Sequence, residues 1–326
     1  MAELVHANDA LEKAHALLVR GDIVAIPTET VYGLAGDATN GRAVAAIFEA
    51  KGRPRFNPLI AHVADLAMAR TIAVFDPLSE RLAAHFWPGP LTLVLPLADG
   101  APVHGLVTAG LSTVAVRMPR GFGAGLIARL GRPLAAPSAN SSGRISATTA
   151  AAVAADLGPR IKLIVDGGPT PLGLESTIVK ATDGTLGLLR PGGIGAAEIE
   201  AVAGVPLRRG RAAAVEAPGM LASHYAPAAA VRLNAVAVGR DEALLGFGPY
   251  RAKGAGEAHT FLNLSASGDL REAAANLFSH LGALDRSGAG RIAVEPVPDF
   301  GLGEAINDRL ARAAAPRDKP ALRAGP

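Results

Sequence analysis

The chain has 326 residues, 49% of them hydrophobic and 19% charged, which suits roughly two domains of about 100 to 200 residues each. Its formal net charge of +3 is too small to argue for nucleic-acid binding. The absence of cysteine excludes disulfides, thiolate metal sites and a cysteine nucleophile. We expect a cytoplasmic protein without membrane association, because the sequence shows no basic leader and no run near the ~20 apolar residues of a membrane span.

Helical and strand-like patterns alternate along the first 200 residues. Asn8 or Asp9 is expected to cap a first helix that stops at Gly21. Further helices are predicted at 43–50, 78–86 and 148–157, and strands at 23–26, 59–63, 91–97, 114–118, 161–165, 177–180 and 186–189. This alternation predicts an α/β domain, a twisted mixed sheet with helices packed on it, over residues 1–204.

The pattern changes between residues 205 and 229, where arginines and small residues show no apolar periodicity; we interpret this segment as a linker. A smaller, Rossmann-like α/β domain is expected over 230–315. Its strands are predicted at 231–233, 243–247, 260–264 and 292–294, and its helices at 270–284 and 304–314. The tail 316–326 is rich in proline and charge and is expected to be disordered.

Two loops carry a mixture of cations, a hydroxyl and amides. Lys51 and Arg53 are predicted to lie on a loop with Asn57, and alone they are typical of a solvated pair at a helix end. Ser138 and Asn140 follow a strand-like segment, a position where open α/β sheets bind ligands, although alone they are typical of an ordinary turn. Together the two loops suit a polyphosphate beside a polar substrate.

Three further features are open to two interpretations. The segment 27–34 (PTETVYGL) follows the first predicted strand and is either ordinary β-forming sequence or a cup for a small ligand. Arg117 alternates with apolar residues, so it needs an anionic partner if it points inward. The island 223–227 (SHYAP) in the linker indicates a lid rather than a tether, and we expect Tyr225 to belong to neither domain core.

Segments 27–34, 51–54 (KGRP) and 137–140 (PSAN) together resemble the YrdC-domain L-threonylcarbamoyl-AMP synthases, in their longer two-domain form. Family-type motifs run from residue 27 to about 227, and the tail segment 301–310 (GLGEAINDRL) extends the resemblance over nearly the whole chain. The resemblance implies a nucleotidyltransferase that condenses L-threonine, bicarbonate and ATP to L-threonylcarbamoyl-AMP and pyrophosphate. The product would serve tRNA threonylcarbamoylation through a partner transferase.

The resemblance also implies roles for individual residues. Catalytic roles fall to Lys51, Arg53, Ser138 and Asn140. ATP binding is implied for these four and for Asn57, Thr113, Ser146, Arg190, His224 and Tyr225. Binding of L-threonine is implied for Thr28, Thr30, Tyr32, His62, Arg117, Ser138 and Ser176. No Gly-x-x-x-x-Gly-Lys-Ser/Thr loop, His-x-x-x-His pattern or acidic cluster is present, so Mg²⁺ is expected to arrive with ATP and no protein metal site is expected.

Two other functions share these features. Related domains are associated with double-stranded RNA binding, so a non-catalytic module for RNA or tRNA is one alternative, and the arginines of the linker would suit it. A carbamoyl-adenylating domain of hydrogenase maturation is another, although the lack of cysteine counts against it. Direct binding of tRNA and the oligomeric state are left open by the sequence.

Overall fold

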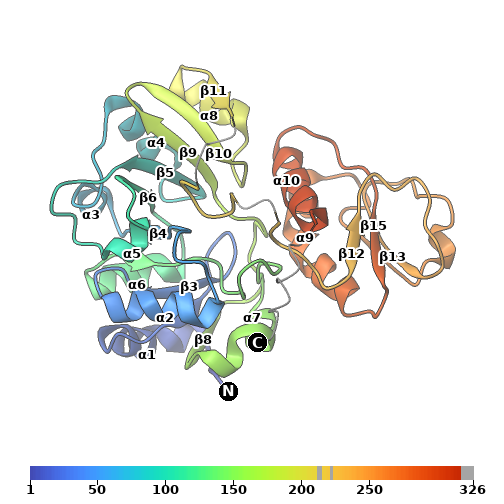
Figure 1. The fold of residues 1–326 in the computed structure, drawn as a ribbon, viewed down its shortest axis with the longest axis horizontal. Helices are drawn as coiled ribbons and strands as arrows, with labels where there is room; N and C mark the ends of the chain where they lie inside the picture. Colours follow the sequence, from blue (N-terminus) through green and yellow to red (C-terminus); the bar gives the residue numbers. More distant parts are fainter. Residues whose placement is uncertain (211–214, 221–222, 317–326) are drawn as a thin grey trace, which may run out of the picture.

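The computed structural model describes residues 1–210, 215–220 and 223–316. The chain forms a larger and a smaller α/β unit, joined by the segment that follows β11 (Figure 1). Arg211, and all of the predicted tail except residue 316, lie outside the described residues. None of the helices in the described part of the chain has the length and apolarity that crossing a membrane requires.

The larger unit is built on an eleven-stranded sheet. Its strands in spatial order are β1 (Glu3–His6), β8 (Leu163–Asp166), β2 (Val24–Ile26), β3 (Gly33–Asp37), β7 (Leu134–Ala135), β4 (Ile60–His62), β6 (Thr113–Arg117), β5 (Leu91–Pro96), β9 (Thr177–Thr182), β10 (Thr185–Arg190) and β11 (Leu207–Arg209). Parallel and antiparallel pairs are interspersed along it, so the predicted mixed sheet is confirmed.

Helices cover both faces of this sheet. They are α1 (Ala7–Val19), α2 (Gly41–Lys51), α3 (Leu66–Arg70), α4 (Pro77–Phe86), α5 (Gly105–Thr108), α6 (Phe122–Leu130), α7 (Ala150–Leu157) and α8 (Ala196–Ala203), with a 3₁₀ turn at Gly158–Arg160. Val24 and Ile26 pack in one apolar cluster with α1 and α6, whereas Ala25 packs in the other with α2 and α4. This alternation follows from the two-residue period of a strand.

The ends of α1 and α2 correct two predictions. His6, not Asn8 or Asp9, caps α1, because β1 runs directly into the helix and the ring nitrogen of His6 accepts from the backbone of Asn8. Helix α2 ends at Lys51, followed by Gly52 in the left-handed region (φ 59°). Lys51 is therefore the last helical residue and does not lie on a loop.

Several elements were absent from the sequence-based prediction, among them β1, β3 and α6. β1 forms because it pairs with β8, which is 160 residues away in the chain. β3 is buried and contains glycine, alanine and aspartate, which have weak strand preference, and its pairing with β2 and β7 stabilises it. α6 contains two glycines, which weaken its helical signal, and it packs against α1.

The smaller unit has a four-stranded sheet in which every pair is parallel. In spatial order its strands are β12 (Ala230–Arg232), β15 (Arg291–Val294), β13 (Glu242–Gly246) and β14 (Thr260–Asn263). A 3₁₀ turn at Ala255–Glu257 precedes β14, and the helices are α9 (Leu270–Asp285) and α10 (Leu302–Ala314). In Figure 1, α9 and α10 lie on the side of the sheet that faces the larger unit. The predicted second α/β domain is confirmed.

The segment between the units is structured at both ends. β11 lies within the predicted linker and pairs in parallel with β10, so the larger sheet extends to Arg209. Tyr225 is buried in the apolar cluster that contains Phe278 of α9, so the prediction that it belongs to neither core is wrong. Val31 and Leu174 of the larger unit join the same cluster. The two units therefore share part of one apolar core.

Gly173 of the larger unit lies against the backbone of α9. A Cβ atom built on Gly173 would lie 2.5 Å from the backbone oxygen of Ala274 and 2.5 Å from Cα of Ala275, and its φ is +73°. Gly184, in the turn between β9 and β10, also has positive φ (+67°), but nothing lies within 4 Å of its Cβ position. Substituting Gly173 and Gly184 in turn therefore distinguishes the effect of backbone strain from that of a clash with the smaller unit.

Gly173→Ala is expected to destabilise the docked arrangement by about 1–3 kcal/mol more than Gly184→Ala, because backbone atoms of α9 cannot move aside as a flexible side chain can. Thermal unfolding and amide hydrogen exchange of α9 measure the effect. Exchange should rise in Gly173→Ala and stay unchanged in Gly184→Ala. Equal behaviour of the two variants would show that the close contact does not matter.

Candidate active site

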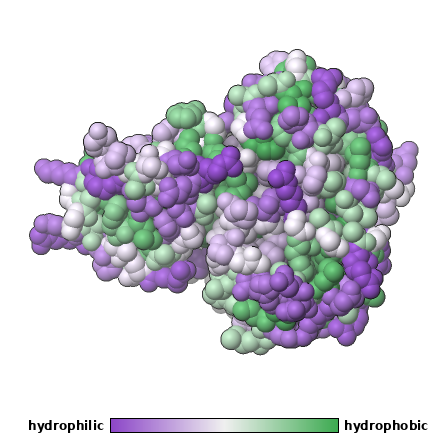
Figure 2. Space-filling view, turned by 180° about the vertical axis from the view of Figure 1, so that it is seen from behind, coloured by the Kyte–Doolittle hydropathy of each residue, from purple (hydrophilic) through white to green (hydrophobic). Residues whose placement is uncertain are grey.

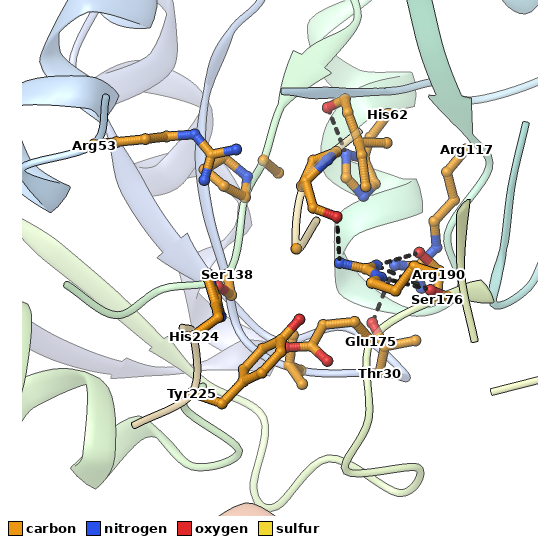
Figure 3. Close-up of a pocket in the computed structure, with 16 residues that line it drawn as sticks. Thr30, Arg53, His62, Arg117, Ser138, Glu175, Ser176, Arg190, His224 and Tyr225 are labelled. Atoms are coloured by element: carbon orange, nitrogen blue, oxygen red, sulfur yellow. Dashed lines mark hydrogen bonds between the residues drawn. The ribbon is translucent and has the colours of Figure 1, made fainter. Parts of the chain in front are cut away.

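A pocket lies where several strands of the larger sheet end, and residues of the segment between the units help to line it (Figure 3). It is lined by Thr30, Val31, Arg53, Ile60, His62, Arg117, Ala136, Pro137, Ser138, Glu175, Ser176, Arg190, Pro218, Gly219, His224 and Tyr225. Nine of the residues predicted for the site lie among these. They come from segments far apart in the sequence.

The strand directions explain how part of this set assembles. β4 and β6 are parallel and end in register, with His62 opposite Arg117. β5 is antiparallel to β6 and parallel to β9, so β9 begins at the edge where β6 ends. β10 returns antiparallel to β9 and ends at Arg190, opposite Ile178. Polar residues at these strand ends therefore meet at one edge of the sheet.

Arg53 points into the pocket from the loop after α2, and its own loop holds it. Its Nε donates to the backbone oxygen of Asn57 at 3.0 Å, and its Nη2 donates to Asn57 Oδ1 and to the oxygen of Pro58, both at 2.7 Å. Burial lowers the pKa of Arg53 to about 9, so the side chain stays charged at neutral pH. Asn57 thus orients Arg53, and its predicted contact with ATP remains a prediction.

Lys51 and Asn140 do not line the pocket. The ammonium group of Lys51 donates to the backbone oxygens of Ser138 and Asn140. Burial lowers the pKa of Lys51, and the positive charge of the nearby Arg53 lowers it further. The side-chain amide of Asn140 donates to the backbone oxygens of Ser141 and Arg144. Both residues therefore hold the loop that presents Ser138 to the pocket. Their predicted direct contacts with ATP remain predictions.

Arg117 has an anionic partner, Glu29, which the sequence-based prediction missed. Its Nη2 lies 2.7 Å from Glu29 Oε1, its Nη1 donates to the hydroxyl of Thr30 at 3.1 Å, and its Nε donates to the oxygen of Gly89. The hydroxyl of Thr28 lies 2.8 Å from that of Thr30. Glu29 sits inside the 27–34 motif, so the requirement of an inward arginine for a carboxylate was the signal that could have identified it.

Of His62 and Tyr32, which were both predicted to bind threonine, His62 lines the pocket and Tyr32 does not. His62 lines the pocket beside Arg117; burial, assisted by Arg117, lowers its pKa to about 3, so it is neutral at pH 7. Tyr32 is fully buried and does not line the pocket. Its hydroxyl donates to the oxygen of Gly168 at 2.8 Å. Tyr32 thus supports the fold near the site.

Arg190 is held by Ser176 and by the segment between the units. Its Nη2 donates to the backbone oxygen of Ser176 at 2.9 Å and to Ser176 Oγ at 3.2 Å, and its Nη1 donates to the oxygen of Pro218 at 3.3 Å. The hydroxyl of Ser176 also lies 2.8 Å from that of Thr92. The side chain is buried, and burial lowers its pKa.

Glu175 contributes a carboxylate to the pocket and was not predicted. Ser146 donates to its Oε1 at 2.5 Å, and Arg309 of α10 donates to its Oε2 at 2.8 Å. Burial alone would raise the pKa of Glu175, but Arg309 and Arg190 hold it at about 2. Ser146, predicted to bind ATP, is thus bonded to Glu175. Nothing in the local sequence around Glu175 distinguishes it, because its partner lies 134 residues away.

His224 and Tyr225 reach the pocket from the segment between the units. Their rings are 4.1 Å apart, and Tyr225 stacks on Phe278 at 5.4 Å. His224 Nδ1 and the hydroxyl of Tyr225 are buried and have no hydrogen-bond partner among the described residues. A buried polar atom without a partner costs about 1–3 kcal/mol, which favours a ligand that satisfies it.

Thr113 is the predicted site residue farthest along β6 from the pocket. It begins the strand, lies on the same face as Arg117 four residues later, and does not line the pocket.

The structure brings together three buried guanidinium groups, those of Arg53, Arg117 and Arg190, with the hydroxyls of Thr30, Ser138 and Ser176. Such a set binds more than one anionic group with directional hydrogen bonds.

No group of three or more His, Asp or Glu side chains in the described ranges could hold a metal ion. Glu175 is the carboxylate of the pocket, and both of its oxygens are engaged by other side chains. The guanidinium groups of the pocket offer donors to anions.

Comparisons with known families match both units. A family model described as "Telomere recombination", which covers Sua5, YciO and YrdC proteins, matches residues 16–192. A second model, described as "Threonylcarbamoyl-AMP synthase, C-terminal domain", matches residues 194–315.

Relatives and solved structures agree over nearly the full length. The threonylcarbamoyl-AMP synthase of Bacillus subtilis is 41% identical, over 97% of this chain and 96% of the relative, and that of Pyrococcus abyssi is 40% identical, over 97% and 99%. The crystal structure of P. abyssi Sua5 complexed with L-threonine has a TM-score of 0.85 at 38% identity, covering 96% of this chain and 97% of that one. The chain therefore belongs to the threonylcarbamoyl-AMP synthase family, in its two-domain form.

Proposed function

We propose that the protein is an L-threonylcarbamoyl-AMP synthase, which condenses L-threonine, bicarbonate and ATP to L-threonylcarbamoyl-AMP and pyrophosphate. The observation that carries this proposal is the convergence of three buried, individually anchored arginines on one pocket lined with hydroxyl groups. The phosphates of one nucleoside triphosphate and the carboxylate of one amino acid supply the anions that such a pocket requires. Family membership supports the same reaction.

The pocket divides into two sides. Arg117, Thr30 and His62 form the side that we assign to threonine, where Arg117 binds the carboxylate and neutral His62 offers a hydrogen bond to the amino acid. Arg53 and Arg190 form the side assigned to the phosphates. The Sua5 structure that contains L-threonine supports threonine as a substrate of this fold.

The reaction needs no enzyme nucleophile. The threonine amine attacks the carbon of CO₂ and releases a proton, or attacks bicarbonate with loss of water, to give a carbamate. A carbamate oxygen then attacks the α-phosphorus of ATP, the bond from that phosphorus to the bridging α,β-oxygen breaks, and pyrophosphate leaves. Arg53 and Arg190 neutralise charge that builds on the phosphates, while Ser138 and Arg117 hold the reacting groups in place. Lys51 and Asn140 contribute by fixing the Ser138 loop.

Mg²⁺ is proposed to enter as part of the Mg–ATP substrate, with phosphate oxygens as its ligands. The segment with His224 and Tyr225 is proposed to act as a lid, because the unpaired polar atoms of both residues belong to the pocket lining. The product would pass to a partner transferase that modifies tRNA, and the expected compartment is the cytoplasm. We do not favour a double-stranded RNA module, because the pocket arginines are only 3 to 7% exposed and cannot contact a duplex.

Threonine dependence is the first test of this function. With ATP, magnesium and bicarbonate, the purified protein should release pyrophosphate when L-threonine is added. L-Valine has a similar volume but lacks the hydroxyl, so it leaves polar groups unpaired and should be about 5- to 150-fold less effective. Equal rates with the two amino acids would refute the threonine assignment.

Arg53→Ala should raise the KM for ATP or lower kcat by about 10- to 150-fold in total, the effect of losing hydrogen bonds to a charged group. Arg55→Ala is the matched control, because Arg55 lies two residues away in the same loop but is exposed and does not line the pocket. Steady-state pyrophosphate release measures both variants, after correction for folded protein. Similar kinetics of the two variants would mean that Arg53 does not contact the nucleotide.

The pH profile tests the absence of a histidine base. Burial lowers the pKa of His62 and of His224 to about 3, so neither ring gains a proton between pH 6 and 8. The rate at low threonine should therefore rise with the fraction of free threonine amine, without a break near the ordinary histidine pKa of about 6.5. A break near that pH that disappears in His62→Asn would contradict this mechanism.

A further inference from the structure

Arg309 is a fully buried cation that the proposed mechanism does not use. It lies on α10 of the smaller unit, is 0% exposed, and is the largest of the fully buried side chains in the described part of the chain. It does not line the pocket. Two of the pocket residues, Glu175 and Tyr225, nevertheless contact it directly.

The contacts of Arg309 cross the boundary between the units. Its Nε donates to Glu175 Oε2 at 2.8 Å, and its Nη1 donates to the neighbouring Asp308 at 2.6 Å. The centre of its guanidinium group lies 5.0 Å from the centroid of the Tyr225 ring, which is the geometry of a cation–π contact. Arg309 thus holds one carboxylate and one aromatic ring of the pocket from outside it.

The charge of Glu175 explains why such a contact matters for binding. Glu175 shares the pocket with Arg53 and Arg190, which are placed to receive an anionic ligand. An uncompensated buried carboxylate there would repel the phosphates and would compete for Arg190. The ion pair with Arg309 compensates that charge, and Ser146 fixes the other oxygen of Glu175.

We propose that Arg309 is a positioning residue for the nucleotide: by neutralising Glu175 and supporting Tyr225, it makes ATP binding depend on the docking of the smaller unit. This inference rests on the proposed function, because it takes the ligand of the arginine side of the pocket to be ATP. A second ion pair between the units, Arg209 with Glu304 at 3.1 Å, involves an arginine that is half-exposed and does not line the pocket. It joins the same two units without reaching the site.

A rescue experiment on the full chain tests whether the charge of Arg309 compensates that of Glu175. Arg309→Met, which removes the charge, should weaken ATP binding by about 10-fold or more in calorimetry without threonine. Glu175→Gln added to Arg309→Met should restore most of that affinity, because the repelling carboxylate is gone. A purely structural role would leave the double variant as weak as Arg309→Met, and that result would overturn the proposal.

Two further variants keep the test decisive. Arg309→Gln removes the charge but keeps hydrogen-bond donors, so it takes the place of Arg309→Met if that variant does not fold. It should show the same loss and the same rescue by Glu175→Gln. Arg209→Gln breaks the other ion pair between the units and should bind ATP within about twofold of the wild type. An equal loss in Arg209→Gln would mean that general loosening of the units, not Arg309, controls binding.

The affinity series is independent of turnover. A wild-type protein that binds ATP but releases no pyrophosphate with threonine would refute the proposed function and leave the Arg309 comparison intact. A normal ATP affinity in folded Arg309→Met, beside an active wild type, would refute the inference alone.

Discussion

The buried ion pair between Arg309 and Glu175 joins the fold to the chemistry of the site. One partner belongs to α10 of the smaller unit, and the other lies in the larger unit, separated from the start of β9 by Ser176. Such a pair is weak as a source of net stability, because removing two charges from water is costly. The pair instead fixes how the two units dock, because each buried charge is stable only when the opposite charge lies beside it. Docking of the units and the charge balance of the pocket are thereby linked.

The other cations of the pocket are also buried and also need partners within the protein. Each cation in or beside it donates to oxygen atoms of the protein: Arg53 to its own loop, Arg117 to Thr30 and Gly89, Arg190 to Ser176 and Lys51 to the Ser138 loop. These bonds fix the direction of the donors before a substrate arrives. A pre-ordered set of charges stabilises a phosphoryl-transfer transition state without reorganisation at the moment of reaction.

Apolar packing also joins the two units. On the face that Figure 2 shows, hydrophilic and hydrophobic residues are intermixed on both lobes. The core cluster of the smaller unit includes Val31 and Leu174 from the larger one, so apolar burial also holds the lobes together. Gly173 allows α9 to approach closely enough for this packing. The segment with Tyr225 is therefore part of the packed structure around the pocket.

Local patterns in the sequence determined the helices with clear apolar periodicity, such as α9 and α10, and the strands with continuous apolar runs, such as β5 and β6. They also located Arg53, Arg117 and Ser138, because a cation or hydroxyl at the end of a predicted element is visible in one short segment. Tertiary structure alone decided the positions of β1 and β3, which depend on pairing with distant strands. It alone brought Glu29 to Arg117 and Glu175 to Arg309. It also turned Lys51 toward the backbone of the Ser138 loop and the side chain of Asn140 toward its own loop. The physical reason is that the cost of burying a charge depends on what folds against it, and the partner of Glu175 stands 134 residues further along the chain.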